Sequence, residues 1–487
     1  MPRFSRFHRF NRMLRFQNTL SGKVEEFVPL TKGQVRMYTC GPTVYDFAHI
    51  GNFRTFVFCD ILRRHLRLSG YQLLHVMNLT DVDDKTINNS RAAGLPLAEY
   101  TQRYSEAFLE DCQRLQIERP EKIVRATDHI QDMAHTIRLL EEKGFTYRRD
   151  NSIYYSIEKF PGYGKLSKID LSGIRSGARV DQDEYAKADA RDFVLWKAPK
   201  PDEPFWETEV GPGRPGWHIE CSVMATKYLG DTLDIHVGGT DLAFPHHENE
   251  IAQAEALTGK TFSRYWLHCE HLVVEGQKMS KSLGNFYTLR DLLGKGYSAA
   301  AIRYLLAAVP YRKQLNFTMD GLRQAAASIE RLENFRFRMT TMPFPEGENV
   351  EIAAKAAAFP EAFQNALDDD LNTAQAMGVL FELVRDANTS IDAGQFRKGN
   401  ITAILKCLDR WNEIFQVLPA SEAGNETDKK TVEGTLSDTD VEQKLQDRRN
   451  ARKARDFALA DRIRDELIAA GILVEDTAEG ARWRRKS

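Results

Sequence analysis

Two short segments of the sequence carry residues that could stabilise the phosphates of a nucleotide. Lys278–Ser282 reads KMSKS, and His49–Asn52, which lies about 230 residues earlier, reads HIGN. Ammonium, imidazole and amide N–H groups can stabilise charge that builds on a phosphoryl group in a transition state. Each segment alone has a simpler explanation, a solvated surface turn for the first and helix capping for the second. Their joint presence favours phosphate chemistry, with His49, Asn52, Lys278 and Lys281 as candidate catalytic residues.

The segments around these residues alternate between strand and helix patterns. Gln34–Cys40 alternates apolar and polar residues like a strand, and Thr55–Leu68 has helical spacing. HIGN is therefore expected at a strand-to-helix junction, where backbone N–H groups and the helix dipole face phosphates. Leu73–Leu79 is a nearly continuous apolar run typical of a buried parallel strand. Further strands are expected at Asn151–Ser156, Asp234–Gly238 and Glu270–Glu275, and further helices at Ala98–Gln116, Asp128–Lys143 and about Pro245–Leu257.

This alternation predicts an α/β fold with a doubly wound, Rossmann-like catalytic domain at 13–297, split by a connective insertion at about 120–205. Helical spacing dominates 298–419 and predicts an α-helical bundle. Residues 420–440 are polar and acidic, which favours a linker. A small mixed module, a helix followed by extended segments, is expected at 441–487. The bundle helices are expected at Ala299–Ala308, Met319–Met339, Glu351–Asp369 and Asn372–Ala393.

Composition narrows the class of protein. The 487 residues are enough for two to four domains, and 42% hydrophobic and 28% charged residues are ordinary for a soluble protein. A net charge of −2 argues against wholesale coating of nucleic acid but allows a local basic patch. The six cysteines are scattered, as in a reduced cytoplasmic protein, and no apolar run reaches membrane-spanning length. Residues 1–12 are rich in arginine and lack acids; we expect a disordered extension before a start at Met13, with a transit peptide as the alternative.

Several longer blocks resemble the cysteinyl-tRNA synthetases, which are class I aminoacyl-tRNA synthetases. The resemblance runs in order from about residue 13 to the C-terminus. The blocks that carry it are Thr39–Asp46 (TCGPTVYD), His49–Asn52, Asn78–Lys85 (NLTDVDDK), Asp192–Lys197 (DFVLWK), Gly216–Ser222 (GWHIECS), Phe244–Glu250 (FPHHENE) and Lys278–Ser282.

The resemblance implies one Zn²⁺ ion, with Cys40, Cys221, His246 and Glu250 as ligands. Spacing alone does not give this set, because single buried cysteines are usually core residues. His246 and Glu250 do have the helical spacing of a ligand pair, but His247 could compete with His246. Zinc prefers a thiolate to a neutral hydroxyl, so the metal would select cysteine over serine without an editing site.

The resemblance also implies the substrates and their contacts. L-cysteine and ATP with Mg²⁺ would form cysteinyl adenylate, and the cysteinyl group would pass to tRNA(Cys). Cys40, Thr80, Trp217 and His236 would line the amino-acid pocket. His49, Gly51, Asn52 and Lys281 would contact ATP phosphates, and Gly238 and Asp241 would contact the ribose. One position departs from the family's HIGH signature, because Asn52 replaces a histidine; its amide can donate but cannot carry charge.

The C-terminal third is expected to bind tRNA. Arg448–Arg455 forms a basic cluster on a predicted helix, which suits either phosphate contact or a solvated face diluted by nearby acids. The resemblance to the family's anticodon-recognition end favours RNA contact. Trp483 could stack on an anticodon base or belong to a small core. A cytoplasmic monomer is expected.

Two alternatives remain, one an enzyme of the same lineage and the other a protein of another functional class. A ligase of the same lineage that joins cysteine to an amino sugar would keep the zinc and ATP residues but should lack the terminal module. A catalytically silent RNA-binding paralogue should have lost His49, Lys281 or a zinc ligand.

Overall fold

The computed structural model describes residues 13–169, 192–419 and 437–485, except 454–455, 471 and 478–479. The chain divides into two compact units, Met1–Leu418 and Pro419–Ser487. The expected extension at 1–12 and most of the expected linker lie outside the described residues.

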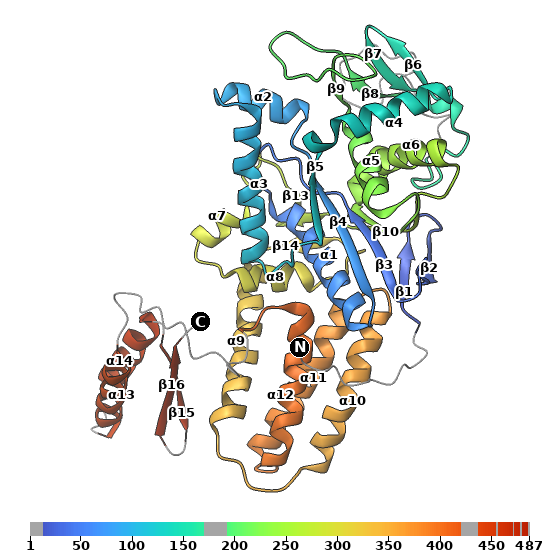
Figure 1. Ribbon diagram of the computed structural model, residues 1–487. Coiled ribbons are helices and arrows are strands. Elements are labelled where there is room, and N and C mark those ends of the chain that lie inside the picture. Colours follow the sequence, from blue (N-terminus) through green and yellow to red (C-terminus); the bar gives the residue numbers. More distant parts are fainter. Residues whose placement is uncertain are drawn as a thin grey trace. The chain divides into compact units, whose positions relative to one another are not determined.

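The first unit is built on a five-stranded parallel sheet with the strand order β11-β10-β3-β4-β5 (Figure 1). The chain leaves β3 for β4 on one side, and the much later β10 pairs with β3 on the other side. Ligands of open α/β sheets bind at the carboxyl ends of strands where the order reverses in this way. The predicted α/β fold is confirmed. The strands are β3 (Gln34–Thr39), β4 (Gln72–Leu79), β5 (Lys122–Arg125), β10 (Leu233–Gly239) and β11 (Ser263–Cys269).

Helices connect these strands and cover the sheet (Figure 1). Helix α1 begins at Ile50 rather than at Thr55, so the HIGN segment forms its first turn instead of preceding it. Strand β11 was not predicted, because it is buried along nearly its whole length and shows no alternation of apolar and polar residues. The helices are α1 (Ile50–Leu68), α2 (Asp84–Ala92), α3 (Leu97–Arg114), α5 (Trp217–Leu229) and α6 (Glu248–Thr258).

The insertion between β5 and α5 forms a second, antiparallel sheet with the order β6-β7-β8-β9. Strand β5, at the start of the expected insertion, belongs to the central sheet, and β9, beyond its expected end, pairs with β8. The described elements of the insertion are α4 (Ile130–Glu142), β6 (Thr146–Arg149), β7 (Ser152–Tyr155), β8 (Phe193–Lys197) and β9 (Arg214–Pro215).

A small three-stranded sheet, β13-β12-β14, carries the KMSKS segment, and a helical bundle follows it. The apolar cores of the sheet and bundle are continuous, which explains why both belong to one compact unit. Helix α12 was missed although Ile404, Leu408, Trp411 and Phe415 give it a clear apolar face. These elements are β12 (Leu272–Val274), β13 (Gln277–Lys278), α7 (Leu289–Gly294), α8 (Ala299–Ala307), β14 (Leu315–Phe317), α9 (Met319–Thr341), α10 (Val350–Asp368), α11 (Thr373–Asp392) and α12 (Ile401–Phe415).

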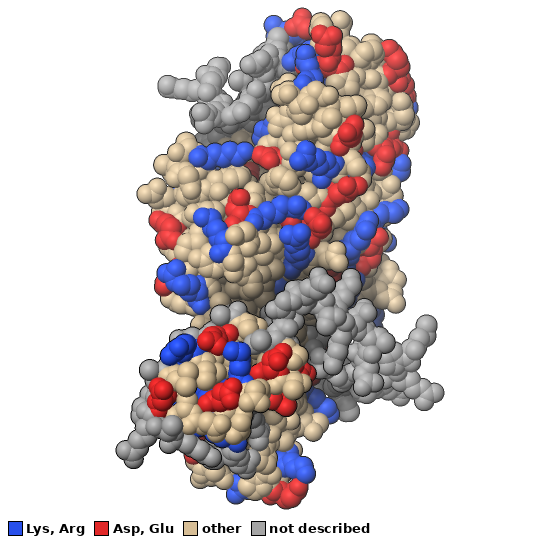
Figure 2. All heavy atoms as spheres, turned by 90° about the vertical axis from the view of Figure 1, so that its left-hand side faces the viewer, with Lys and Arg blue, Asp and Glu red and all other residues tan. Residues whose placement is uncertain are grey.

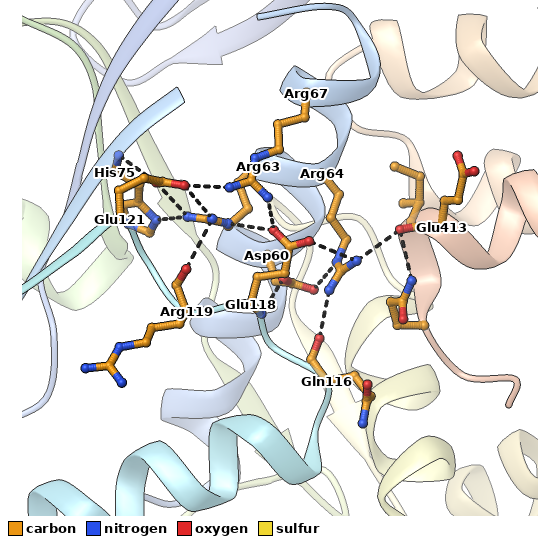
Figure 3. Close-up of polar contacts among 12 residues, drawn as sticks. Asp60, Arg63, Arg64, Arg67, His75, Gln116, Glu118, Arg119, Glu121 and Glu413 are labelled. Atoms are coloured by element: carbon orange, nitrogen blue, oxygen red, sulfur yellow. Dashed lines mark hydrogen bonds and ion pairs between the residues drawn. The ribbon is translucent and has the colours of Figure 1, made fainter. Parts of the chain in front are cut away.

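Buried ion pairs fix helix α1 to its neighbours (Figure 3). The Asp60 carboxylate is fully buried and accepts hydrogen bonds from Arg64 Nε and the Glu118 backbone N–H, each at 2.8 Å. It also pairs with Arg303 of α8, which donates to the carbonyl of Phe415 at the end of α12. Although burial alone would raise the pKa of Asp60, Arg303 and Arg64 hold it below its ordinary value. The helix that begins with HIGN is therefore clamped at its middle.

A second arginine of α1 extends the same network (Figure 3). Arg63 is nearly fully buried and contacts Glu118 at 3.1 Å, Glu121 at 3.0 Å and His75 Nδ1 at 2.9 Å. These contacts join α1 to strand β4 and to the segment that leads into β5.

Replacing Asp60 with asparagine should lower the free energy of unfolding by about 1.5–3 kcal/mol, because Arg303 would lose its charged acceptor in a buried site. Asp369→Asn is a matched control, since the Arg15–Asp369 pair is about half exposed, and we expect less than about 1 kcal/mol there. Chemical denaturation at neutral pH measures both. Equal, small losses would contradict a clamping role for Asp60.

The described residues of the second unit form two helices and a pair of antiparallel strands. Arg448 is buried, so it does not belong to an exposed basic face, whereas Arg449 and Arg452 are exposed. Trp483 is half-buried and packs against a small core that includes Val441 and Leu467. The elements are α13 (Asp438–Lys453), α14 (Phe457–Ala469), β15 (Ile472–Thr477) and β16 (Gly480–Arg485).

Among the described residues, no helix is both long enough and apolar enough to span a membrane.

Candidate functional site

The HIGN and KMSKS segments lie against each other at the carboxyl end of the sheet. The Ile50 N–H donates to the carbonyl of Tyr287 at 3.0 Å, which ties the start of α1 to the chain beyond KMSKS. A Cβ on Gly51 would lie 2.9 Å from the His49 ring and 3.3 Å from Met279 Cε, so glycine leaves room for both side chains. The structure thus brings together two segments that are remote in the sequence.

His49 and Asn52 form a reciprocal cap at the start of α1. The Asn52 N–H donates to His49 Nδ1 at 3.2 Å, and the His49 N–H donates to Asn52 Oδ1 at 3.1 Å. Capping and phosphate contact are therefore compatible rather than alternatives. Burial, with a smaller contribution from the charge of Lys281, lowers the pKa of His49 to about 4. Because Nδ1 of the neutral ring accepts a hydrogen bond, the ring proton lies on Nε2, which can donate to a phosphate oxygen.

This pKa predicts the pH dependence of the contribution of His49. The ratio of wild-type to His49→Gln activation rates should stay constant between about pH 6 and pH 8, since the imidazole is neutral across that range. The pH profile of the ATP–pyrophosphate exchange that the resemblance implies, recorded at saturating cysteine, measures the ratio. A ratio that rises as the pH falls through about 6.5 would show that the imidazolium form acts instead.

Lys281 is exposed and pairs with a carboxylate close to HIGN. Its Nζ lies 2.8 Å from Asp46 Oδ2, with 68% of the lysine side chain and 36% of the aspartate side chain exposed. The hydrogen bond with Asp46 raises the pKa of Lys281, which remains cationic. An ion pair this exposed is worth at most about 1 kcal/mol, so a phosphate group that binds here could displace Asp46. Lys278 is also exposed, on β13.

Four buried side chains from four segments converge beside this region. Cys40 follows β3, Cys221 lies on α5, His246 lies in the turn Ala243–His247, and Glu250 lies on α6. One potential ligand atom of each lies within 4.8 Å of the other three. Cys40 Sγ is 3.7 Å from Cys221 Sγ and 3.5 Å from Glu250 Oε1. This donor set suits a tetrahedral divalent metal such as zinc.

A second set of potential ligands overlaps the first, with His236 and His247 in place of Cys221 and His246. His247 Nε2 lies 3.4 Å from Cys40 Sγ, so the two histidines do compete for one region. His246 Nδ1 contacts His218, while its buried Nε2 has no hydrogen-bond partner among the described residues, although Glu250 Oε1 is 3.1 Å away. His236 Nδ1 of the second set is likewise buried without a hydrogen-bond partner among the described residues. The first set is favoured instead by its two thiolates, the soft ligands that zinc prefers.

The pKa shifts of Cys40 and His246 are also compatible with a bound metal ion. Burial raises the pKa of the Cys40 thiol well above its ordinary value, and hydrogen bonding with Cys221 adds to the shift. Burial and the neighbouring histidines lower the pKa of His246, which keeps its lone pair available. A bound divalent cation would offset the free-energy cost of ionising the buried thiols, because it supplies positive charge next to them.

The side chains expected to line the amino-acid pocket surround this cluster. Trp217 stacks on His246, with ring centroids 4.2 Å apart. His236 Nε2 lies 2.9 Å from Glu250 Oε2, and the imidazole stacks on Trp266. Thr80 is buried at the end of β4.

The Gly238–Asp241 segment lies at the end of β10. A Cβ on Gly238 would lie only 2.5 Å from His247 Cε1, so glycine is needed for close packing there. Asp241 is exposed on the turn after the strand. Exposure leaves its carboxylate available to a ligand.

Several polar residues of the site carried no individual signal in the sequence. His218 and His268 orient the two competing histidines, at 2.9 Å from His246 and 2.8 Å from His247. Glu220 is fully buried beside Cys221, and burial raises the pKa of its carboxyl well above the ordinary value. Helical spacing from Trp217 and Cys221 within the GWHIECS block could have placed Glu220 near the cluster.

Comparisons with known proteins agree with this geometry. Residues 26–327 match the family described as tRNA synthetases class I (C) catalytic domain. Residues 362–418 match the DALR domain, and 438–484 match the cysteinyl-tRNA ligase anticodon binding domain. A cysteine–tRNA ligase of Solibacter usitatus (strain Ellin6076) is 61% identical over 97% of this chain and 100% of that protein. One from Koribacter versatilis (strain Ellin345) is 53% identical over 96% and 99%.

Solved structures share the fold. Mycobacterium tuberculosis methionyl-tRNA synthetase in complex with methionyl-adenylate has a TM-score of 0.60 at 15% identity, covering 79% of this chain and 91% of that chain.

Proposed function

The chain belongs to the cysteine–tRNA ligase family of class I synthetases, and from that premise we propose that it activates L-cysteine with ATP and transfers it to tRNA(Cys). The observation that carries this proposal is the convergence of Cys40, Cys221, His246 and Glu250 beside the joined HIGN and KMSKS segments. The retained cysteinyl-tRNA ligase anticodon binding match over 438–484 speaks against the amino-sugar ligase. The retained candidate residues speak against a silent paralogue.

In the first step the cysteine carboxylate oxygen attacks the α-phosphorus of ATP. The new O–P bond forms as the bond to the β-phosphate oxygen breaks, which gives cysteinyl adenylate and pyrophosphate. His49 Nε2–H and the amide of Asn52 would donate to phosphate oxygens, while Lys281 leaves Asp46 to neutralise the charge that builds there. Lys278 supplies a second cation at the edge of the site. Mg²⁺ travels with the ATP phosphates and needs few protein ligands.

Cys40, Cys221, His246 and Glu250 would hold one zinc ion beside the amino-acid pocket. Zinc bound there would take the sulfur of the substrate as a thiolate, a ligand that the hydroxyl of serine cannot match. Trp217 and His236 would enclose the side chain, because both pack directly on metal-ligand residues.

Contacts to the rest of ATP would come from the ends of β10 and α1. Gly51 would allow the phosphates to approach the backbone closely. Gly238 and Asp241 would contact the ribose. Both glycines lie where a side chain would collide with its neighbours.

In the second step a ribose hydroxyl of the terminal adenosine of tRNA(Cys) attacks the adenylate carbonyl and releases AMP. We propose that 298–419 and 441–487 bind the tRNA, with 13–297 as the catalytic domain and 420–440 as the linker. Figure 2 shows basic side chains interspersed with acidic ones over one face, so tRNA contact would depend on individual arginines and lysines rather than on one uniform patch. Exposed Arg449 and Arg452 are better candidates than buried Arg448.

Charging of tRNA tests the second step. The full chain should attach cysteine to a tRNA(Cys) transcript, and a chain that ends at Leu418 should charge it more weakly while retaining cysteine activation. Charging that survives the truncation unchanged would remove the terminal module from tRNA recognition.

We further propose that the protein acts as a cytoplasmic monomer. All six cysteines are free and buried, as in a reducing compartment.

A further inference from the structure

The carboxylate of Asp46 lies next to the proposed ATP site, and the steps above give it no role except to hold Lys281. Asp46 precedes His49 by three residues, and 36% of its side chain is exposed. Its Oδ1 accepts a hydrogen bond from the Phe47 N–H at 2.8 Å, and its Oδ2 lies 2.8 Å from Lys281 Nζ. The backbone therefore holds one oxygen in place, and the other oxygen faces the lysine.

Lys281 lies on a turn that is braced by its own hydrogen bonds. The Ser280 N–H donates to Asn285 Oδ1 at 2.8 Å, and Asn285 Nδ2 donates to the carbonyl of Lys278 at 3.2 Å. Residues 281–284 at the tip are all exposed. Because these hydrogen bonds do not involve the side chain of Lys281, the lysine can exchange one partner for another while the turn keeps its shape.

Lys281 lies close both to Asp46 and to the HIGN segment. Burial lowers the pKa of His49, and the charge of Lys281 adds to this shift, so the ammonium group already lies near HIGN. The hydrogen bond with Asp46 is in turn the main cause of the raised pKa of Lys281. Two anionic partners, the Asp46 carboxylate and a bound phosphate, would therefore compete for one ammonium group.

We propose that Asp46 is a positioning residue that competes with the phosphates of ATP and pyrophosphate for Lys281. Lys281 must leave the carboxylate before it can bind a phosphate, so the ion pair weakens the binding of both ligands. When pyrophosphate leaves, Lys281 returns to Asp46, and this second partner favours release of the product. This inference rests on the proposed function, because it concerns the same ATP site.

The competition should change ligand binding rather than the chemical step. An ion pair that exists only in the free enzyme affects the complex with ATP and the transition state equally. Such a uniform effect changes KM without changing kcat. The coupling within an exposed ion pair corresponds to at most about a fivefold change in an equilibrium constant.

The substitution Asp46→Asn tests the competition, because it removes the charge and keeps an oxygen that can accept from the Phe47 N–H. Calorimetry on the zinc-replete full chain with Mg²⁺–ATP and no cysteine should give a Kd about two- to fivefold lower than that of wild type. In ATP–pyrophosphate exchange, the KM values for ATP and pyrophosphate should fall by a similar factor, while kcat stays within about twofold of wild type. A higher Kd for ATP would overturn the inference, since it would show that Asp46 contributes to the binding of ATP.

The same substitution in a Lys281→Ala background separates competition from direct repulsion. The negative charge of Asp46 could repel phosphates without involving the lysine, and that effect would persist in the double variant. Competition predicts that most of the gain in ATP affinity disappears when Lys281 is absent. An equal gain in both backgrounds, or no gain in either, would overturn the inference.

Asp132 gives a matched control, because it pairs with Lys227 at 2.6 Å and is 37% exposed. Asp132→Asn should leave the Kd of ATP at the wild-type value. Asp46→Glu, which keeps the carboxylate, should bind ATP within about twofold of wild type. If Asp46→Asn does not fold, Asp46→Ser tests the same prediction. Absence of cysteine-dependent exchange in wild type would instead be a failure of the proposed function.

Discussion

Replacing Lys281 with alanine is expected to slow cysteine activation by about 10²–10³-fold, the usual effect of removing one preorganised group that stabilises transition-state charge. Lys281 is suited to this role because only an exposed ion pair with Asp46 holds it. Its ammonium group is therefore available to the phosphates at little energetic cost. ATP–pyrophosphate exchange under saturating cysteine and ATP measures the rate, and zinc content should stay unchanged.

Lys295 is a matched control for this substitution. It is an exposed lysine at the end of α7, and we assign it no role in the site. Lys295→Ala should therefore exchange at the wild-type rate. A Lys281→Ala variant that matches Lys295→Ala would remove Lys281 from the ATP site.

Replacing His246 with alanine is expected to abolish stoichiometric zinc binding and, with it, selective activation of cysteine. His246 Nε2 is buried and lacks a hydrogen-bond partner among the described residues, so it is available to a metal, and its loss leaves three of the four ligands. Elemental analysis of the purified variant measures the metal directly. The reduction in zinc affinity should exceed the roughly 10–100-fold that loss of an outer-shell partner causes.

The substitution His247→Ala distinguishes the two overlapping ligand sets. If His246 is the ligand, His247 is an outer-shell contact to Cys40, and its loss should lower zinc affinity by about 10–100-fold while the purified protein still carries metal. His135→Ala, which changes an exposed histidine on α4, should leave zinc content at the wild-type value. Zinc loss in the His247 variant with retention in the His246 variant would reverse the assignment.

The spacing of apolar residues in the sequence predicted most of the strands and helices that position these residues. The central strands β3, β4 and β10 and the bundle helices α8 to α11 lie within a few residues of their predicted bounds, because apolar runs and helical spacing reflect their burial directly. The sequence of strand β11 shows no alternation of apolar and polar residues, since both faces of the strand are buried. Helix α12 did have an apolar face and could have been found.

Residue spacing predicted much less of the candidate site. Cys40 and Cys221 are 181 residues apart, so only the family resemblance linked them before the fold brought their sulfurs to 3.7 Å. Glu220 lies in a run of consecutive buried residues on α5, where no polar face marks it as special. The reciprocal cap of His49 and Asn52 and the Asp46–Lys281 pair likewise depend on geometry that spacing does not contain.

The most direct test of the central claim is ATP–pyrophosphate exchange by the purified, zinc-replete full chain, with cysteine and serine compared side by side. Cysteine should support exchange, and serine should be activated far more poorly, because its hydroxyl cannot replace a thiolate ligand. Absence of exchange with cysteine would contradict the proposed activity. Comparable rates with serine would contradict selection of the substrate through the cluster of Cys40, Cys221, His246 and Glu250.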